Sequence, residues 1–171
     1  MTSLVLDRIA SPLGDLLVVS DDTIVYALDF EDFQPRMMRL LEKRFPSIQL
    51  TQANPRGELR DRLVAYLEGH WSALNGMLVN PGGTPFQQQV WQALRSIPVG
   101  TVWTYKQLAE HLGRPQACRA VGRANSQNPI AIILPCHRVI GRQHHLTGYA
   151  GGLDRKRWLL HHEGVSLAQA S

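Results

Sequence analysis

The run Asn80-Pro81-Gly82-Gly83 constrains the fold of this chain more than any other segment, because it fits neither a helix interior nor a central strand. The residues before it have mainly the pattern of strands and turns, whereas those after it have the pattern of several short helices. With 171 residues, of which 44% are hydrophobic, the chain can form one domain or two small ones with buried cores. This run is the best candidate for a linker between them.

The residues before this run favour a small sheet with helices. Aliphatic and β-branched residues gather in short runs, and Ser11–Gly14 and Asp21–Asp22 have the composition of turns. A helical spacing of apolar side chains then begins at Gln34-Pro35. Strands are expected over residues 4–9, 16–20, 23–30 and 49–54, and helices over residues 34–45 and 59–67.

The residues after the run begin with a helix start signal. Thr84-Pro85-Phe86-Gln87 combines a capping-box pattern with proline at the first helical position. Apolar residues follow at helical spacing, and Pro98 and Gly100 end the helix. The residues expected in the core from this segment are Phe86, Val90, Trp91, Leu94 and Ile97.

Two further helices, over residues 104–112 and 116–125, are joined by a turn that contains Gly113 and Pro115. Two short helices with a glycine-containing turn form a helix-turn-helix. Arg119 and Arg123 are four residues apart and so share one face of the second helix, although an ordinary helical pair with a solvated basic face is the alternative. The residues expected on the inward side of the second helix are Ala117, Ala120, Val121 and Ala124.

Charge is distributed unevenly along the chain. Residues 1–80 carry 8 basic and 11 acidic side chains, whereas residues 81–171 carry 10 and 3. A strongly basic half is typical of a protein that binds a polyanion such as nucleic acid, although solvated arginines need no partner. Charge alone leaves both interpretations open.

Cys136 carries the clearest chemical signal, because it stands between a proline and a histidine, after an apolar run over 130–134 that is expected to form a strand. Pro135 restricts the backbone before the thiol, and His137 offers a proton acceptor near neutral pH. The thiolate is the reactive form of cysteine, and a neighbouring base favours it. Cys136 is therefore a candidate nucleophile, and a buried structural cysteine is the alternative.

Other classes of function have less support. Cys118 and Cys136 do not make a disulfide framework, and neither a signal peptide nor a membrane-spanning run is recognisable, so we expect a cytoplasmic protein. The histidines lack the Cys-x-x-Cys and His-x-x-x-His spacings of zinc sites, so no metal is expected. The loop Gly148–Gly152 lacks the lysine and the helix placement of a phosphate-binding loop.

Several motifs of the second half occur together in one known family. They are Thr84–Gln87, Val90-Trp91, Ile97-Pro98, Tyr105, Leu108-Ala109, Arg119–Gly122, Asn128-Pro129, Pro135–Val139, Thr147–Gly152 and His162–Gly164. In order and in spacing, residues 81–164 resemble the O6-alkylguanine-DNA alkyltransferases of the bacterial single-function type. The sequence Pro-Cys-His-Arg-Val is highly specific, whereas the first half is similar only through Ser11–Gly14 and its strand pattern.

The resemblance implies an α+β protein with a small N-terminal α/β domain, ribonuclease-H-like in shape, at residues 1–79. Residues 80–171 would form a winged helix-turn-helix domain. It also implies DNA repair by direct damage reversal, in which the protein binds the minor groove and flips the damaged base. The alkyl group then passes irreversibly to the cysteine without a cofactor. The expected partner is double-stranded DNA with O6-alkylguanine, and O4-alkylthymine is a second possible substrate; a monomer is expected.

The resemblance also implies roles for individual residues. Cys136 would accept the alkyl group, His137 would take the thiol proton through a water, and Glu163 would orient His137. Tyr105 would support the leaving guanine, and Arg119 would fill the stack in place of the flipped base. Asn128 would tie the second helix of the helix-turn-helix to the loop that carries Cys136, and Val139, Tyr149 and Ala150 would line the guanine pocket. Ala120, Arg123 and Asn128 are expected, with Arg119, to be the DNA-binding residues.

Three features depart from the family pattern. Cys118 stands where the family usually has alanine, and we expect a small inward or partly exposed residue that transfer does not need. Arg123 adds a charge that would strengthen contacts with the DNA backbone. No cysteine occurs in residues 1–80, so the N-terminal zinc site of some relatives would have no thiol ligands here.

Two other functions are alternatives. Alkyltransferase-like proteins bind alkylated guanine without transfer, but they have a non-nucleophilic residue where this chain has Cys136. A cysteine hydrolase or redox enzyme would fit the Cys136–His137 pair, but it would leave the helix-turn-helix and Arg119 unexplained. A single turnover per molecule distinguishes alkyl transfer from such an enzyme.

Overall fold

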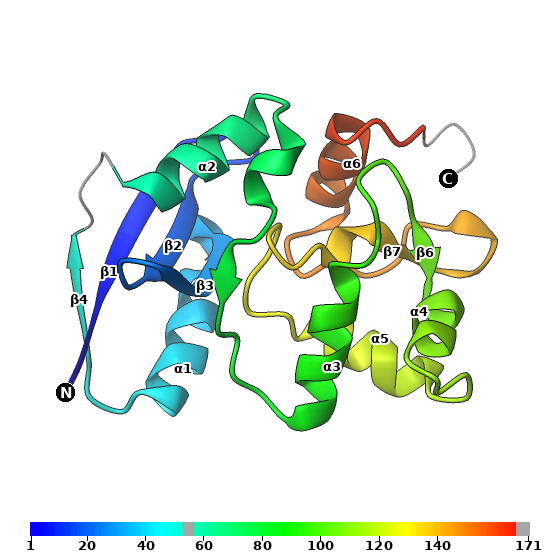
Figure 1. Ribbon diagram of the computed structural model, residues 1–171, viewed down its shortest axis with the longest axis horizontal. Helices are drawn as coiled ribbons and strands as arrows, with labels where there is room; N and C mark the ends of the chain where they lie inside the picture. Colours follow the sequence, from blue (N-terminus) through cyan, green and yellow to red (C-terminus); the bar gives the residue numbers. More distant parts are fainter. Residues whose placement is uncertain (53–56, 167–171) are drawn as a thin grey trace. The chain divides into compact units, whose positions relative to one another are not determined.

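The computed structural model of this chain describes residues 1–52 and 57–166, which fold into two compact units (Figure 1). The first comprises residues 1–82 together with 129–133, and the second comprises residues 83–128 together with those from 134 onward. Helices and strands occur in both, so the predicted α+β class is confirmed. In the described ranges, no helix is both long enough and apolar enough to cross a membrane.

A five-stranded sheet in the order β4-β1-β2-β3-β5 forms the centre of the first unit. Its central three strands are antiparallel neighbours, whereas β4 runs parallel to β1 and β5 runs parallel to β3. Parallel pairs need long crossover connections, and the two helices of this unit lie within them. The elements are β1 (Thr2–Ile9), β2 (Leu16–Ser20), β3 (Ile24–Phe30), η1 (Glu31–Phe33), α1 (Gln34–Arg44), β4 (Ile48–Gln52), α2 (Glu58–Leu67), η2 (Trp71–Leu74) and β5 (Leu78–Val79).

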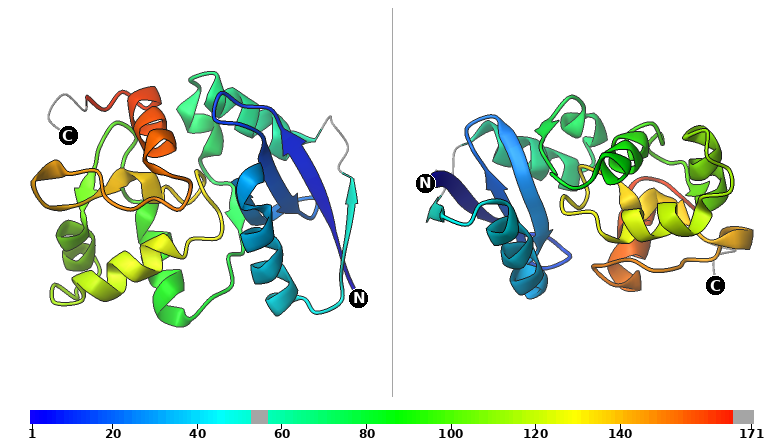
Figure 2. Two further views of the ribbon diagram at one scale, coloured as in Figure 1. Left: turned by 180° about the vertical axis from the view of Figure 1, so that it is seen from behind. Right: turned by 90° about the horizontal axis from the view of Figure 1, so that it is seen from below.

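Both faces of this sheet are covered, because all five residues of β2 are buried. The helices α1 and α2 lie on opposite faces (Figure 2). Met37 and Leu41 of α1 pack in one apolar cluster with Leu17 and Val19, which alternate along β2 and so point to the same side. The strand expected over 49–54 is observed as far as Gln52, and residues 53 and 54 lie outside the described part of the chain.

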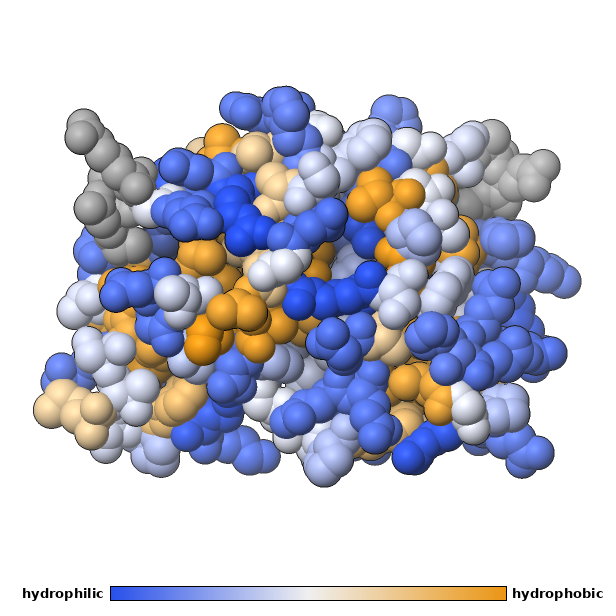
Figure 3. All heavy atoms as spheres, in the orientation of Figure 1, coloured by the Kyte–Doolittle hydropathy of each residue, from blue (hydrophilic) through white to orange (hydrophobic). Residues whose placement is uncertain are grey.

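The second unit is built on three short helices that pack on one another. Its elements are α3 (Pro85–Leu94), β6 (Trp103–Thr104), α4 (Tyr105–His111), α5 (Cys118–Ser126), η3 (Cys136–Arg138), β7 (Val139–Ile140), η4 (Arg142–His144) and α6 (Leu153–His162). The helix-turn-helix predicted from the sequence is formed by α4 and α5. Hydrophilic side chains gather over α4 on the face shown in Figure 3.

Local sequence signals fix the starts of two of these helices. The hydroxyls of Thr84 and Thr104 each accept a hydrogen bond from the backbone N–H three residues later. In return, the side-chain oxygens of Gln87 and Gln107 accept from the backbone N–H of the two threonines. These reciprocal bonds are capping boxes, which satisfy N–H groups that would otherwise lack a helical partner. The indole of Trp91 donates to the carbonyl of Ala124 at 2.8 Å, and this bond holds α3 against α5.

The expected strand over 130–134 is wrong. Ile130 alone forms a bridge, to Leu28 of β3, and the following residues turn, with Ile132 at a φ of 70°. Leu28 donates to the carbonyl of Pro129 and accepts from the N–H of Ala131, so residues 129–133 belong to the first unit. A short apolar run signals burial, but its periodicity does not distinguish a strand from a buried turn.

The inward orientation expected for Ala120 is also wrong. Val121 and Ala124 are buried as predicted, whereas Ala120 is exposed beside Arg119 and Arg123. A helix turns by about 100° per residue, which places Ala120 at the margin of the buried stripe and on its basic side. Asn125, which was not predicted, is buried instead.

Candidate active site

Cys136 lies where a loop continues directly into two short elements, η3 and β7. It begins η3, which leads into β7, and Val139 of β7 is paired with Trp103 of β6. The residue after β6 is Tyr105, so the strand pairing links the start of α4 to the segment that follows the thiol. Asn128, just beyond α5, donates its amide to the carbonyl of Leu134 at 2.8 Å. The cysteine loop is therefore tied both to β6 and to the end of α5.

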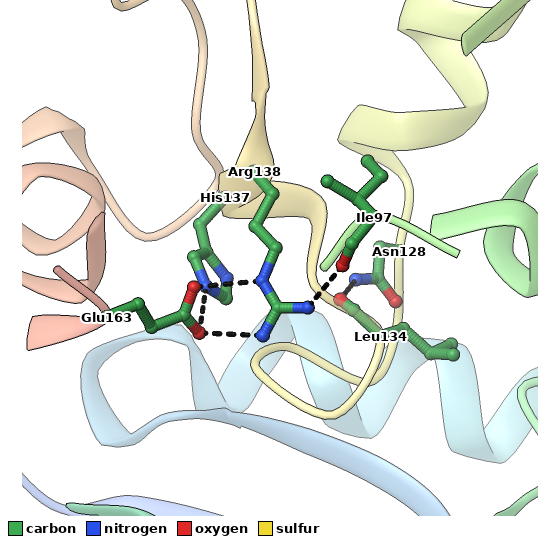
Figure 4. A network of polar contacts seen from close by, with 6 residues as sticks. All are labelled: Ile97, Asn128, Leu134, His137, Arg138 and Glu163. Carbon is green, nitrogen blue, oxygen red and sulfur yellow. Dashed lines mark hydrogen bonds and ion pairs between the residues drawn. The ribbon is translucent and has the colours of Figure 1, made fainter. Parts of the chain in front are cut away.

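A buried histidine and a buried carboxylate lie beside this loop. His137 Nε2 and Glu163 Oε1 are 2.8 Å apart, and both side chains are fully enclosed (Figure 4). His137 comes from η3, whereas Glu163 is the C-cap residue directly after α6. The fold therefore brings together two residues that are 26 positions apart in the sequence.

The same carboxylate also binds Arg138, which was not predicted as part of the site. Arg138 Nε lies 2.8 Å from Glu163 Oε2, and Nη2 lies 2.9 Å from Oε1. Its third nitrogen, Nη1, donates to the carbonyl of Ile97 at 2.7 Å (Figure 4). Arg138 is part of the Pro-Cys-His-Arg-Val sequence, which was the one signal that could have identified it.

These contacts determine the charges in the site. Burial alone would raise the pKa of Glu163, but the contacts with His137 and Arg138 outweigh it, and the pKa lies well below its ordinary value. Burial lowers the pKa of His137, and although Glu163 opposes this effect, Arg138 and Lys156 add to it. At neutral pH the site therefore holds an ionised carboxylate and an uncharged imidazole.

An uncharged imidazole has one donor and one acceptor nitrogen. Because His137 Nε2 faces the carboxylate, we assign the proton to Nε2 and the lone pair to Nδ1. Nδ1 is buried and makes no hydrogen bond to any residue within 1–52 and 57–166. His137 thus offers a proton acceptor on the side of the ring away from Glu163.

Lys156 of α6 is a second charged residue of this region that was not predicted. Its side chain is fully buried, and Nζ donates to the carbonyl of Val139 at 2.6 Å and to that of Thr147 at 2.7 Å. Burial lowers the pKa of Lys156 to about 8, against an opposing effect of Cys136. The sequence Arg155-Lys156-Arg157 gives no sign that its central cation is the buried one.

The depressed pKa of Lys156 predicts a pH dependence of stability. Because the folded value of about 8 is below the ordinary 10.5, the folded protein binds fewer protons between these values, and stability rises with pH there. From pH 8 to 9.5, wild type should gain about 1 to 2 kcal/mol in unfolding free energy relative to Lys156→Met. Urea denaturation at the two pH values measures this difference. A Lys106→Met variant, at an exposed lysine, is the control. The same change in unfolding free energy with pH in wild type and in Lys156→Met would contradict the prediction.

The other predicted residues are distributed over α4, α5 and the loop before α6. Tyr105 is half-buried against Gly122 of α5, where an added Cβ would lie 3.6 Å from the ring. On α5, Arg119, Ala120 and Arg123 are exposed. In the loop, Tyr149 is half-buried and Ala150 is exposed, and Val139 of β7 is buried.

No group of three or more histidine, cysteine, aspartate or glutamate side chains that could hold a metal occurs in the described ranges. The carboxylate of Glu163 is instead paired with His137 and Arg138, and the cations of Arg138 and Lys156 also bond to backbone carbonyls. The site provides a thiol, a neighbouring base and a residue that orients the base, which is the arrangement needed to activate a nucleophile.

Comparison with known proteins covers both halves of the chain. Residues 5–78 match the family model described as "6-O-methylguanine DNA methyltransferase, ribonuclease-like domain", and residues 85–165 match the "DNA binding domain" of the same family. The chain is 49% identical over 170 residues to the methylated-DNA–protein-cysteine methyltransferase of Salmonella typhimurium, covering 98% of this chain and 99% of that protein.

Two solved structures from Mycobacterium tuberculosis are also similar. One is O6-methylguanine methyltransferase, with 37% identity and a TM-score of 0.77, covering 98% of this chain and 95% of that one. The other is OGT in complex with DNA, with 38% identity and a TM-score of 0.78, covering 93% and 92%. The predicted combination of a ribonuclease-like unit and a DNA-binding unit is thereby confirmed.

Proposed function

Because the chain belongs to the 6-O-methylguanine DNA methyltransferase family, whose members repair DNA by alkyl transfer to a cysteine, we propose that Cys136 is the residue that accepts the alkyl group. The observation that carries this assignment is the buried contact between His137 and Glu163 directly after the thiol. The other cysteine, Cys118, is half-exposed on α5, and its Sγ lies 3.6 Å from the carbonyl oxygen of Pro115.

The proposed reaction follows from the charges of the site. His137 Nδ1 takes the proton of the Cys136 thiol through a bridging water, and Glu163 stabilises the imidazolium that forms. The sulfur then attacks the alkyl carbon of O6-alkylguanine, and a C–S bond forms as the C–O6 bond breaks. The leaving guanine keeps the electron pair of that bond and is finally protonated. The product is a thioether, which is a poor leaving group, so each molecule acts once.

The exposed face of α5 is the proposed DNA-contacting surface. Arg119, Ala120 and Arg123 share this face, and the two guanidinium groups carry charge complementary to phosphate. A target carbon within a base pair is out of reach of a buried thiol, so the reaction needs the base flipped out of the duplex. We propose that Arg119 occupies the place of the flipped base in the DNA base stack, and that Arg123 contacts the DNA backbone in the minor groove.

The guanine pocket is proposed to lie between the start of α4, β7 and the loop before α6. Tyr105 would donate its hydroxyl to the guanine as negative charge develops on the ring. Val139 and the loop residues Tyr149 and Ala150 would line the pocket. The two hydrogen bonds of Lys156 join the carbonyls of Val139 and Thr147, and thus connect two of these segments.

The proposed chemistry is tested by intact-protein mass spectrometry after incubation with duplex DNA that contains one O6-methylguanine. We expect a gain of one methyl group per molecule, with no further gain at excess substrate. An unchanged mass with the duplex still bound would instead indicate an alkylguanine sensor without transfer activity. Continued product formation beyond one equivalent would indicate a turnover enzyme, and both results would refute the proposal.

Arg119 and Arg123 should differ in what they contribute. Arg119→Ala should slow methyl transfer from duplex DNA by roughly 30-fold, because about 2 kcal/mol of support for the flipped state is lost. Transfer from a single strand should change little in that variant, since no base pair is opened. Arg123→Ala should instead weaken binding to any sequence and lower the slope of log K against log salt by about 1. Single-turnover rates and salt titrations distinguish the two roles, and equal effects of Arg119→Ala on both substrates would contradict the assignment.

A further inference from the structure

The guanidinium of Arg138 is fully engaged although it has no step in the proton path. Its Nε and Nη2 bind the two oxygens of Glu163, and its Nη1 binds the carbonyl of Ile97, so each of its three nitrogens has a partner within 2.9 Å. Arg138 is 8% exposed and Glu163 is 1% exposed. This parallel two-bond arrangement is the strongest geometry that arginine and a carboxylate form.

The paired contacts fix the plane of the carboxylate. Glu163 Oε2 faces Arg138 Nε, while Oε1 lies between Arg138 Nη2 and His137 Nε2 (Figure 4). The guanidinium is in turn held by the carbonyl of Ile97, just beyond α3. A rotation of the carboxylate would break at least one charge-assisted bond, so the acceptor offered to His137 has a defined position.

The charge of Arg138 matters as much as its geometry. A buried carboxylate beside an imidazole favours the imidazolium, and a neighbouring thiol can then supply the proton and rest as a thiolate. A cation on the same carboxylate offsets this effect. The site could therefore rest either as thiol and neutral imidazole or as thiolate and imidazolium, and the net charge around His137 decides between them.

We propose that Arg138 is a positioning residue, which fixes and neutralises Glu163 so that His137 rests as an uncharged base with Nδ1 free to accept a proton. This inference rests on the proposed function, in which His137 takes the proton of Cys136. On this proposal, Arg138 determines the resting state of Cys136. With Arg138 in place the residue rests as a thiol that is activated only during the reaction, and without it the residue would rest as a permanently charged thiolate.

The groups that face His137 support this assignment. From η3 the charged group is Arg138, and from α6 and its C-cap they are Lys156 and Glu163. The thiol of Cys136 precedes His137 in η3 and acts on Lys156. Burial, Arg138 and Lys156 lower the pKa of His137, and Glu163 raises it. Removal of Arg138 would take away one lowering effect and leave the raising effect of Glu163 without its counter-charge.

The test is an NMR titration of the His137 ring nitrogens in the full chain without DNA, between pH 5 and 8. In wild type, His137 should titrate below its ordinary pKa of 6.5. In Arg138→Met, His137 should titrate with a pKa raised by about one unit or more, and the acid limb of the single-turnover rate should move up in pH with it. The exposed Arg157→Met, on α6, is the matched control and should leave both curves unchanged.

Arg138→Lys separates charge from geometry and also serves if Arg138→Met does not fold. Lysine keeps the charge but lacks the planar fork, so the acid limb should stay in place while the plateau rate falls about tenfold. An unchanged rate and profile in Arg138→Lys, or a neutral His137 in folded Arg138→Met, would overturn the proposal. The titration needs no alkylated DNA, so its result is independent of whether wild type gains a methyl group.

Discussion

Replacement of Cys136 by serine should abolish methyl transfer while leaving the fold and DNA binding intact. Serine is close to cysteine in size, so the buried position can accept it, but a hydroxyl is a far weaker nucleophile and stays protonated beside a neutral imidazole. We expect a loss of about 10⁴-fold or more in the single-turnover rate. The readout is the mass of the protein after incubation with O6-methylguanine duplex, with binding followed in parallel.

Cys118 provides the matched control for this experiment. It is the other cysteine of the chain, and it is half-exposed near the start of α5, where Arg119 and Arg123 also lie. Cys118→Ala should accept one methyl group at the wild-type rate. Methylation of Cys136→Ser, or loss of transfer in Cys118→Ala, would show that the acceptor has been misassigned.

The difference between what could and could not be predicted from the sequence is physical. The capping box at Thr84 was predicted because it depends on residues three positions apart, and the one at Thr104 has the same local pattern. The adjacent Cys136 and His137 could likewise be recognised in the sequence. Local patterns of this kind are visible without the fold. The helix-turn-helix was predicted for the same reason, since its turn and its apolar spacing lie in one continuous segment.

Features that depend on partners far away in the chain could not be recognised in the sequence. Arg138 and Lys156 have the composition of ordinary surface cations, and only the fold supplies the buried acceptors that make their burial tolerable. The turn over 129–133 likewise depends on Leu28, about a hundred residues earlier in the chain. Ala120 was wrongly expected to be buried because it lies at the edge of the apolar stripe of the helix. A small rotation of the helix about its axis decides whether such a residue is buried or exposed.

Glu163→Gln should cause the second large effect, a loss of both transfer and stability. Glutamine can still accept from His137, but it no longer balances Arg138, whose guanidinium would be left buried with neutral partners. Removal of one partner of a buried ion pair typically costs about 3–5 kcal/mol, which we expect here for the free energy of unfolding at pH 7. Urea denaturation measures the loss, and single-turnover kinetics measures transfer.

The pH dependence of this loss identifies its cause. The pKa of Glu163 in the folded protein is below its ordinary value of 4.5, so the stability that its charge contributes is complete above pH 4.5 and is lost as the pH falls below it. The difference in the free energy of unfolding between wild type and Glu163→Gln should therefore become smaller at acid pH. Glu110→Gln is the control, because Glu110 is exposed on α4 and 3.8 Å from Lys106, an arrangement worth about 0.5 kcal/mol or less. A difference that is independent of pH would mean that packing of the side chain, rather than charge balance around Arg138, accounts for the loss.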